Sequence, residues 1–488
     1  MLRERAESAQ PGPGLNPAPA TVRLGAIGVA PRAGGPALNA RGRRNEEPVS
    51  LRRTRLAASL ALLTLVALSW AAPAAAQSPL RRWQEAARER VEAARERVET
   101  TRERIETARE RWRAERNIEL RMALGELRGR LAPPPPAPDF SPRSWGQGRL
   151  ERGPGGVPIL YLSGTPEEMG AQHGHLLGRE VRALTRYLRG FLGPRELESA
   201  QARARELFLA HTPAAYLREA EALAAAAGLP LEQLLFAQWF TDMYRVFACT
   251  CVGAPSDEGP LLARNLDFPG QGYLGRYSLL VVVHPQGKRP YVSVSWPGLL
   301  GVLSGMNEGV ALAVMVVHRA APTAGVPFQL AFRSALEEAG DAAGVEAHLR
   351  ALSLTVSNNL MVVDRGGAAR VLELEPGHVV TTRRPDGEGR VISTNHFLGQ
   401  PEPWRPSLTH LSSLVRYRKA DRVAHAEPGP LSLDRARAAL KETASATLTQ
   451  QSMVFLPARG QMDLALRDEP PATDGRWVRL DVRALLAR

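Results

Sequence analysis

Cysteine is scarce in this chain: Cys249 and Cys251 are the only two among 488 residues. Two cysteines cannot build the disulfide framework typical of small secreted domains. Residues i and i+2 of a strand share a face, but a bridge across one residue is uncommon. We therefore expect two free thiols. A pair of thiols retained in an oxidising compartment indicates a reactive group more than a structural disulfide.

Motifs for metal ions and nucleotides are also lacking. No His-x-x-x-His or Cys-x-x-Cys set has the spacing of metal ligands. No glycine-rich loop has the pattern that cradles phosphates. The ten histidines are scattered and suggest no Ser-His-Asp set. We expect neither a metal nor another cofactor.

Lysine is rare, with only Lys288, Lys419 and Lys441, so arginine carries nearly all of the positive charge. The formal net charge of +13 is unevenly distributed, because residues 1–143 hold 26 arginines and 16 acidic residues. Residues 144–488 are left with a net charge of +3. Because this larger part is close to neutral, the high isoelectric point does not predict a nucleic-acid partner.

The N-terminal 77 residues predict export. Residues 1–50 are rich in proline, glycine and arginine, which is typical of a disordered or mis-annotated extension. Residues 51–77 run from a basic stretch through an apolar core to small residues, the order of a signal peptide cleaved after Ala76. The apolar core is short for a membrane span, and an uncleaved anchor is the weaker alternative. We expect a secreted, periplasmic or cell-envelope protein with no integral span after cleavage.

Residues 78–131 contain a repeat of seven. Apolar residues recur at one seam position and small residues at the other, with Arg-Glu-Arg triplets between them. The pattern predicts a coiled coil and hence a homo-oligomer through this segment. A solvated single helix held by i,i+4 Glu–Arg pairs is an equal alternative. Residues 132–143 are rich in proline and predict a stiff linker. The seam positions are Val91, Val98, Ile105 and Trp112, beside Ala87, Ala94, Thr101 and Ala108.

The globular body is predicted over 144–488 as an α+β domain. A strand over 157–162 precedes Thr165-Pro166-Glu167-Glu168, a capping box that begins a helix. Further helices are predicted after Thr212-Pro213, over 231–244 and, as a pair, within 326–352. Strands are predicted over 248–254, 260–266, 277–284, 290–296, 299–304, 310–317, 359–364, 370–375, 453–456 and 462–466.

The strongest chemical signal lies in the first predicted hairpin. Cys249 begins one strand, and Arg264-Asn265-x-Asp267 stands in the next. A thiol that acts as a nucleophile needs a base, an oxyanion partner and charged groups that orient it. Two paired strands and a turn can fold the downstream groups back onto the thiol, so the pattern favours an enzyme.

These residues resemble the N-terminal-nucleophile (Ntn) hydrolases of the penicillin acyltransferase type, which are related to choloylglycine hydrolases and acid ceramidase. The resemblance extends over most of 157–488 and implies a four-layered αββα fold. It divides the body into a helical pro-segment (144–248) and a catalytic part (249–488). It rests on Cys249-Thr250, Gly259, Arg264-Asn265-x-Asp267-Phe268, Thr165-Pro166-x-x-Met169-Gly170-x-x-x-Gly174, Gly305-Met306-Asn307-Glu308-Gly309, Ser393-Thr394-Asn395-His396 and Ser412-Ser413-Leu414-Val415-Arg416.

The resemblance implies that the chain cuts itself between Ala248 and Cys249. The new α-amine of Cys249 would then serve as general base. An α-amine titrates near ~8 and a thiol near ~8.5, so the two can exchange a proton near neutral pH. Such an enzyme would hydrolyse a small-molecule amide, or transfer its acyl group, through a thioester. An exported protein has little access to acyl-coenzyme A, which favours hydrolysis.

The resemblance also assigns roles to the other site residues. Asp267 would accept from the new ammonium, and Arg264 would steady the thiolate. Asn307 and Asn395 would offer side-chain amides toward the oxyanion or the amine. Arg416 completes the set, although Arg418 could take its role.

Several alternatives stay open at this level. Cys251 is expected to be a packing residue, and His396 to form supporting hydrogen bonds. Arg264 and Asp267 could be a structural ion pair. The whole chain could be a catalytically inactive cell-envelope binding protein on the same fold, or a cysteine amidase that is never cut.

Overall fold

The structure is a computed structural model. It describes residues 83, 85–100, 120, 123–127, 130–131, 134–192, 194–245, 248–319, 321–400 and 407–488. The predicted extension (1–50) and signal peptide (51–77) lie outside the described residues. In the described part of the chain no helix is long and apolar enough to cross a membrane.

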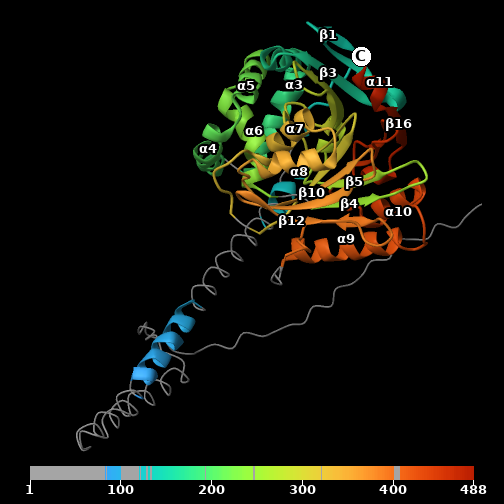
Figure 1. Cartoon of the computed structure of the whole chain (residues 1–488). Coiled ribbons are helices and arrows are strands. Elements are labelled where there is room, and N and C mark those ends of the chain that lie inside the picture. Colours follow the sequence, from blue (N-terminus) through green and yellow to red (C-terminus); the bar gives the residue numbers. More distant parts are fainter. Residues whose placement is uncertain are drawn as a thin grey trace, which may run out of the picture. The chain divides into compact units, whose positions relative to one another are not determined.

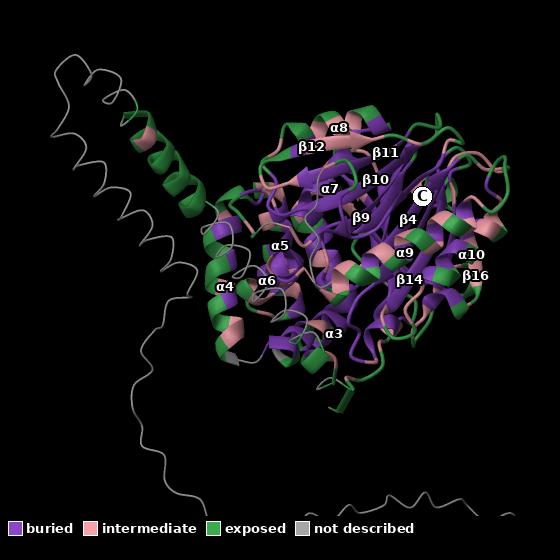
Figure 2. Cartoon of the chain, turned by 90° about the horizontal axis from the view of Figure 1, so that it is seen from below, coloured by how far each residue is buried: buried purple, intermediate pink, exposed green. Residues whose placement is uncertain are grey.

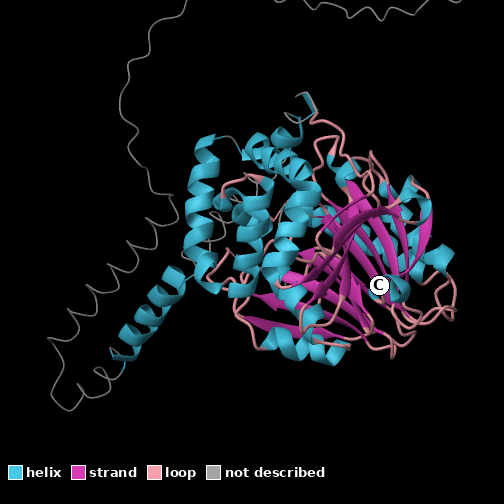
Figure 3. Ribbon diagram, turned by 90° about the horizontal axis from the view of Figure 1, so that it is seen from above, coloured by secondary structure: helices cyan, strands magenta, loops and turns pink. Residues whose placement is uncertain are grey.

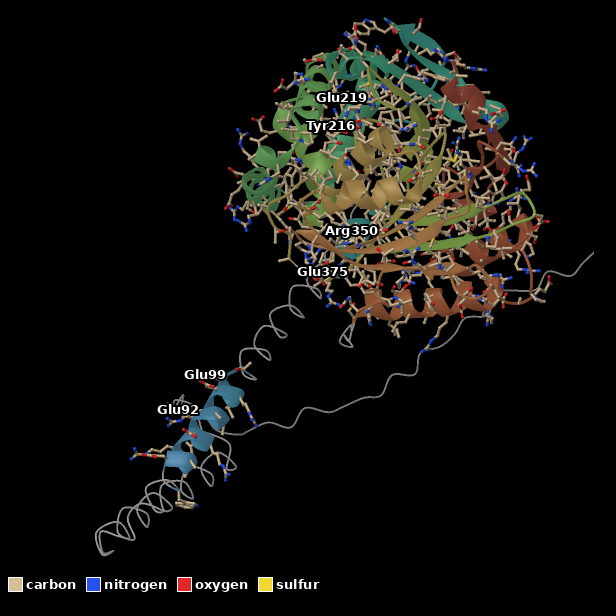
Figure 4. All side chains as sticks on the ribbon, in the orientation of Figure 1. Glu92, Glu99, Tyr216, Glu219, Arg350 and Glu375 are labelled. Carbon is tan, nitrogen blue, oxygen red and sulfur yellow. The ribbon has the colours of Figure 1, made fainter. Side chains whose placement is uncertain are left out.

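The chain divides into two units, residues 1–98 and 99–488. Within the heptad segment, residues 85–100 are helical. Val91 and Val98 are 60% and 68% exposed, and the side chains of Glu92 and Glu99 extend from this helix in Figure 4. Because the structure contains a single chain, the coiled coil and the homo-oligomer both stay predictions.

The body contains two antiparallel-rich sheets. The larger has the strand order β1-β2-β3-β6-β7-β8-β9-β10-β11-β12, and β3 pairs with β6 in parallel. Its strands are β1 (Arg143–Trp145), β2 (Gly148–Arg152), β3 (Pro158–Gly164), β6 (Leu279–Pro285), β7 (Tyr291–Ser295), β8 (Ser304–Asn307), β9 (Val310–Val316), β10 (Asn358–Asp364), β11 (Ala369–Glu375) and β12 (His378–Arg383).

The smaller sheet carries the cysteines. Its strand order is β13-β4-β5-β14-β15-β16, with every neighbouring pair antiparallel. Its strands are β4 (Ala248–Ala254), β5 (Leu261–Asp267), β13 (Val391–Ser393), β14 (Thr449–Leu456), β15 (Gln461–Leu466) and β16 (Trp477–Asp481).

Helices lie on the outer sides of the two sheets. The helices α9 and α10 run along the smaller sheet beside β4 and β5, as Figure 1 shows, and α8 contacts β10, β11 and β12 of the larger one. The helices are α3 (Pro166–Leu192), α4 (Pro194–Phe208), α5 (Ala214–Ala227), α6 (Leu231–Met243), α7 (Phe328–Glu338), α8 (Ala342–Arg350), α9 (Leu408–Ala424), α10 (Leu433–Thr443) and α11 (Val482–Leu486).

The two sheets face each other across the main core. Strands β4 and β5 contact β9 and β10 of the other sheet, and the strands between the helix layers are almost entirely buried in Figure 2. Val252, Ala263 and Val454 form a second core with α9 and α10 on the other side of the smaller sheet. The order of layers is therefore helix, sheet, sheet, helix, with the strands enclosed by helices in Figure 3.

Most of the predicted elements are confirmed. The capping box forms, with the Thr165 N–H donating to Glu168 Oε2 at 2.7 Å and the Glu168 N–H to Thr165 Oγ1 at 3.2 Å. The strand predicted over 299–304 is wrong, because β8 begins only at Ser304. Apolar residues there, such as Leu300, are buried ahead of the strand. The elements β1, β2, α4, β12, β13, α9, α10, β16 and α11 were not predicted.

Candidate active site

The β4–β5 hairpin positions Cys249, the candidate nucleophile. A tight turn links the strands, with mutual main-chain hydrogen bonds between Ser256 and Gly259 at 3.0 Å. Gly259 has a φ of +97°, a conformation that side chains disfavour. The resulting register places Cys249 opposite Leu266 and Cys251 opposite Arg264. Because cross-strand partners share a face, both thiols and the Arg264 side chain lie on the inner face of the sheet.

Arg264 contacts the Cys249 thiol across this hairpin. Its Nη2 lies 3.3 Å from Sγ. Its Nη1 donates to Ser304 Oγ at 2.6 Å and to the Leu303 carbonyl, which ties the guanidinium to the opposite sheet. All these groups are buried. Arg264 is therefore held as a fixed positive charge beside the sulfur.

The backbone of Cys249 is held from the other side by two residues far away in sequence. Its N–H donates to Asn395 Oδ1 at 2.7 Å, and its carbonyl accepts from Nη1 of Arg416. Arg416 Nη2 also donates to Asn395 Oδ1 at 2.8 Å. The structure thus brings Arg416 into the site, whereas Arg418 is exposed.

Asp267 lies at the end of β5, opposite Ala248 in the strand register. Its Oδ1 accepts from Thr449 Oγ1 at 2.6 Å. Its Oδ2 is buried with no hydrogen-bond partner among the described residues. Burial raises the pKa of Asp267 to about 6, although the charges of Arg416 and Arg264 and the Thr449 hydrogen bond oppose the rise. Asp267, the register partner of Ala248, therefore has one buried carboxylate oxygen without a hydrogen-bond donor among the described residues.

Electrostatics at the thiol combine opposing effects. Burial raises the pKa of the Cys249 thiol, and the charge of Asp267 raises it further. The charges of Arg264 and Arg416 and the main-chain N–H of Asp267 lower it. Burial also raises the pKa of Cys251, and there Arg264 is the one charge among the described residues that lowers it. Of the two thiols, Cys249 has the surroundings of a reactive group and Cys251 those of a packing residue.

The structure gives Asn307 a role other than the expected one. Its Nδ2 donates to the carbonyls of Leu336 and Ala339 at 2.8 and 2.7 Å. Its Oδ1 accepts the N–H groups of Gly309 and Val310 at 2.9 Å each. Both amide hydrogens are used by main-chain acceptors, so this side chain builds the turn after β8 and has no N–H left for an oxyanion.

Asn359, which no sequence motif indicated, helps to hold Asn395 in place. Asn359 of β10 donates to the carbonyls of Thr394 and His396, the neighbours of Asn395, at 2.9 and 2.8 Å. His396 Nδ1 lies 2.8 Å from Ser413 Oγ of α9. Burial lowers the pKa of His396 to about 4, so it is neutral near pH 7 and forms supporting hydrogen bonds, as expected. In the sequence, a polar residue such as Asn359 in an otherwise apolar strand is a weak signal for this supporting role.

An apolar cavity lies beside the site. It has about 90 Å³ of space open to the centre of a water-sized molecule. Phe268 follows Asp267, and Leu303 is the residue whose carbonyl binds Arg264. Helices α3 and α6, both before Cys249 in the chain, supply most of the remaining wall. Their lining residues include Val181, Leu184, Leu188, Leu234, Ala237 and Phe240.

No group of three or more histidine, cysteine or acidic side chains that could hold a metal occurs among the residues with described positions. The polar groups around Cys249 bond to one another and to the main chain. This arrangement can stabilise a thiolate at Cys249 and orient the amine or amide nitrogen of the same residue. The neighbouring cavity can hold an apolar group beside the thiolate and this nitrogen.

Comparisons with known proteins match parts of the chain. The family model for acyl-coenzyme A:6-aminopenicillanic acid acyl-transferase matches residues 255–452. This match contains Arg264, Asp267, Asn395 and Arg416 and begins six residues after Cys249.

Two curated relatives come from Dictyostelium discoideum. Protein dcd1B is 29% identical over 217 residues, which cover 37% of this chain and 43% of that protein. Protein dcd1A is 23% identical over 220 residues, which cover 37% and 50%. The chain thus matches about half the length of these relatives.

Among solved structures, the Caenorhabditis elegans N-acylethanolamine-hydrolyzing acid amidase ortholog is similar at 14% identity and a TM-score of 0.35. The match covers 43% of this chain and 93% of that one.

Proposed function

The chain is a member of the penicillin acyltransferase-like Ntn family, matched over residues 255–452, and we propose that it is a self-processing cysteine enzyme that cleaves a small-molecule amide. The observation that carries this proposal is the convergence on Cys249. Its sulfur faces Arg264, its N–H faces Asn395, and its carbonyl faces Arg416. A buried cysteine that served only as packing would not need three polar contacts from three segments.

The first step would be cleavage of the Ala248–Cys249 bond. The Cys249 thiolate attacks the Ala248 carbonyl, the C–N bond breaks, and the acyl group moves to sulfur. Water then hydrolyses the thioester and leaves a carboxylate on Ala248 and an α-ammonium on Cys249. Asp267 stands opposite Ala248 in the strand register, and its buried Oδ2, which has no hydrogen-bond partner among the described residues, would accept from the ammonium.

The second reaction would use the same atoms on a substrate. The α-amine takes the thiol proton, and the thiolate attacks the substrate carbonyl to form a thioester. The proton passes to the leaving amine, and water completes the hydrolysis. Asn395 and Arg416 orient the amine and the backbone around it, and Arg264 stabilises the thiolate.

The apolar cavity supports an acyl group without charge as the bound part of the substrate. Its lining includes Leu184, Ala237, Phe240 and Trp296, which would exclude water from the thioester. Among N-acyl amino acids, acylated amines, lactams and ceramide-like lipids, this favours substrates with an apolar acyl chain. Rates on a series of N-acyl amides of increasing chain length would test the preference.

Export and self-association are further parts of the proposal. The segment order over 51–77 supports a signal peptide, and the heptads over 78–131 support a homo-oligomer. Hydrolysis is proposed over acyl transfer, because an exported protein has little access to acyl-coenzyme A.

Intact mass spectrometry of the purified chain tests the core of the proposal. The wild type should split after Ala248, Cys249→Ala should stay whole, and the matched control Cys251→Ala should split like the wild type. A single uncut chain in all three would contradict self-processing. Amide hydrolysis by the uncut wild type would then favour the unprocessed amidase, and no activity with an unreactive thiol the inactive binding protein.

A further inference from the structure

A second cavity lies apart from the catalytic groups. It has about 420 Å³ open to water-sized molecules, within the range of about 300–1,000 Å³ typical of small-molecule sites. Segments from both sides of the proposed cleavage bond line it, namely 137–158, 275–278 and 464–478. None of the residues placed around Cys249 takes part in its wall. The cavity is therefore a separate feature of the fold.

Its lining is strongly basic. Four arginines face one acidic residue, Asp468, which gives the wall a formal charge of +3. This charge is local, because residues 144–488 as a whole are also only +3. Like charges around one cavity repel one another, so the arrangement is unfavourable without a counter-charge. The arginines are Arg152, Arg276, Arg467 and Arg476.

The four guanidiniums have no carboxylate within ion-pair distance among the described residues. Arg479, three residues after Arg476, shows the contrast, because it contacts both Glu258 and Asp463. Arg152 donates only to the carbonyl of Gly156, at 3.0 Å. These arginines are thus available to an external anion.

Buried polar atoms at the cavity also indicate an anionic ligand. The Nε of Arg276 is buried with no hydrogen-bond partner in the described part of the chain, and an unsatisfied buried donor of this kind is unfavourable. Ser278, 3% exposed, also lines the wall. Its Oγ accepts from Gln451 Nε2 at 3.2 Å, which leaves its own hydroxyl hydrogen for a ligand.

We propose that this cavity binds a small molecule carrying two phosphoryl groups. Two such groups carry about −3 to −4 near neutral pH, which matches the +3 of the wall. Planar guanidinium groups donate pairs of parallel hydrogen bonds to phosphate oxygens. This inference goes beyond the proposed amidase function and does not depend on it.

Isothermal titration with inorganic pyrophosphate on the full chain tests the site. Saturable binding at one site is expected, weakening as salt is raised. Arg276→Gln and Arg467→Gln should each weaken binding by tenfold or more. Arg203→Gln, which removes an exposed arginine paired with Glu206 on α4, should bind like the wild type. Arg467 is exposed, so its variant tests the site even if Arg276→Gln fails to fold.

Three outcomes would overturn the proposal. They are no saturable binding, equal affinity in the wild type and both cavity variants, or tighter binding of citrate than of pyrophosphate at the same ionic strength. The titration is repeated on Cys249→Ala, which cannot process itself. Binding that persists in this variant separates the phosphate site from any failure of the proposed catalysis.

Discussion

Nη2 of Arg264 lies 3.3 Å from Sγ of Cys249, and both side chains come from the same hairpin. Burial raises the pKa of the thiol, and the charge of Arg264 is the largest effect that lowers it. Arg264 cannot move away freely, because Ser304 and the Leu303 carbonyl hold the same guanidinium. This contact therefore decides how much thiolate Cys249 forms near neutral pH.

Replacing Arg264 by glutamine should slow alkylation of Cys249. Loss of the positive charge raises the thiol pKa, and each unit of increase lowers the thiolate fraction about tenfold at a fixed pH below the pKa. Iodoacetamide labelling from pH 6 to 10, followed by mass in a Cys251→Ala background, measures the shift. The exposed Arg418→Gln is the control. An unchanged labelling profile in Arg264→Gln would contradict the role given to this residue.

Asp267 should make stability depend on pH in a defined window. Its pKa is raised from 3.8 to about 6, so the folded state binds this proton more tightly than the unfolded state. The free energy of unfolding should therefore fall as pH rises from about 4 to about 6, by up to about 3 kcal/mol from this group. Urea unfolding at pH 4, 5 and 6, in the uncut Cys249→Ala background, measures it. The Asp267→Asn variant should lack this pH-dependent part of the free energy of unfolding. The same change of unfolding free energy with pH in both proteins would rule out the effect.

Asn359 should act as a positioning residue for Asn395. Its Nδ2 bonds the carbonyls on both sides of Asn395, so Asn359→Ala should let that segment shift. We expect the self-cleavage rate to fall by roughly tenfold or more, since small misplacements of catalytic groups are costly. The labelling pKa of Cys249 should stay unchanged, because Arg264 is not disturbed. Asn358→Ala on the same strand is the control, and equal cleavage rates in the two variants would disprove the role.

The two chains formed by self-cleavage should stay together. Strand β3, before the cut, pairs with β6 after it, and buried Arg333 of α7 bonds Glu219 of α5 at 2.7 Å. Figure 4 shows Glu219 beside Tyr216 on the same helix. Breaking a buried pair costs about 3–5 kcal/mol, so Glu219→Gln should lower the urea concentration at which the fragments separate. Glu206→Gln, from an exposed pair, should have little effect. Separation of wild-type fragments in native gel filtration would refute the prediction.

Local patterns in the sequence were enough to predict the hairpin that carries the two cysteines. Alternating side chains and a glycine turn between 248–254 and 260–266 predict β4 and β5, and the observed register places Arg264 against the thiol. The capping box at Thr165 likewise needs only four consecutive residues. These features are decided by contacts between near neighbours, which is why they could be read from the residues themselves.

Only the tertiary structure decided which distant residues complete the site. On α9, residues 413, 416 and 420 share the buried face. Arg418 lies about 200° around the helix from Arg416, so only Arg416 of these two arginines faces the site. The motif led us to expect the Asn307 amide near the oxyanion or the amine, yet the carbonyls of Leu336 and Ala339, at the end of α7, accept both of its amide hydrogens. The strand expected over 299–304 begins only at Ser304, because burial in the core accounts for apolar residues such as Leu300 without a strand there. The contacts of Asn359 and the walls of both cavities come from segments far apart in the chain. No local sequence pattern predicts which of these segments meet.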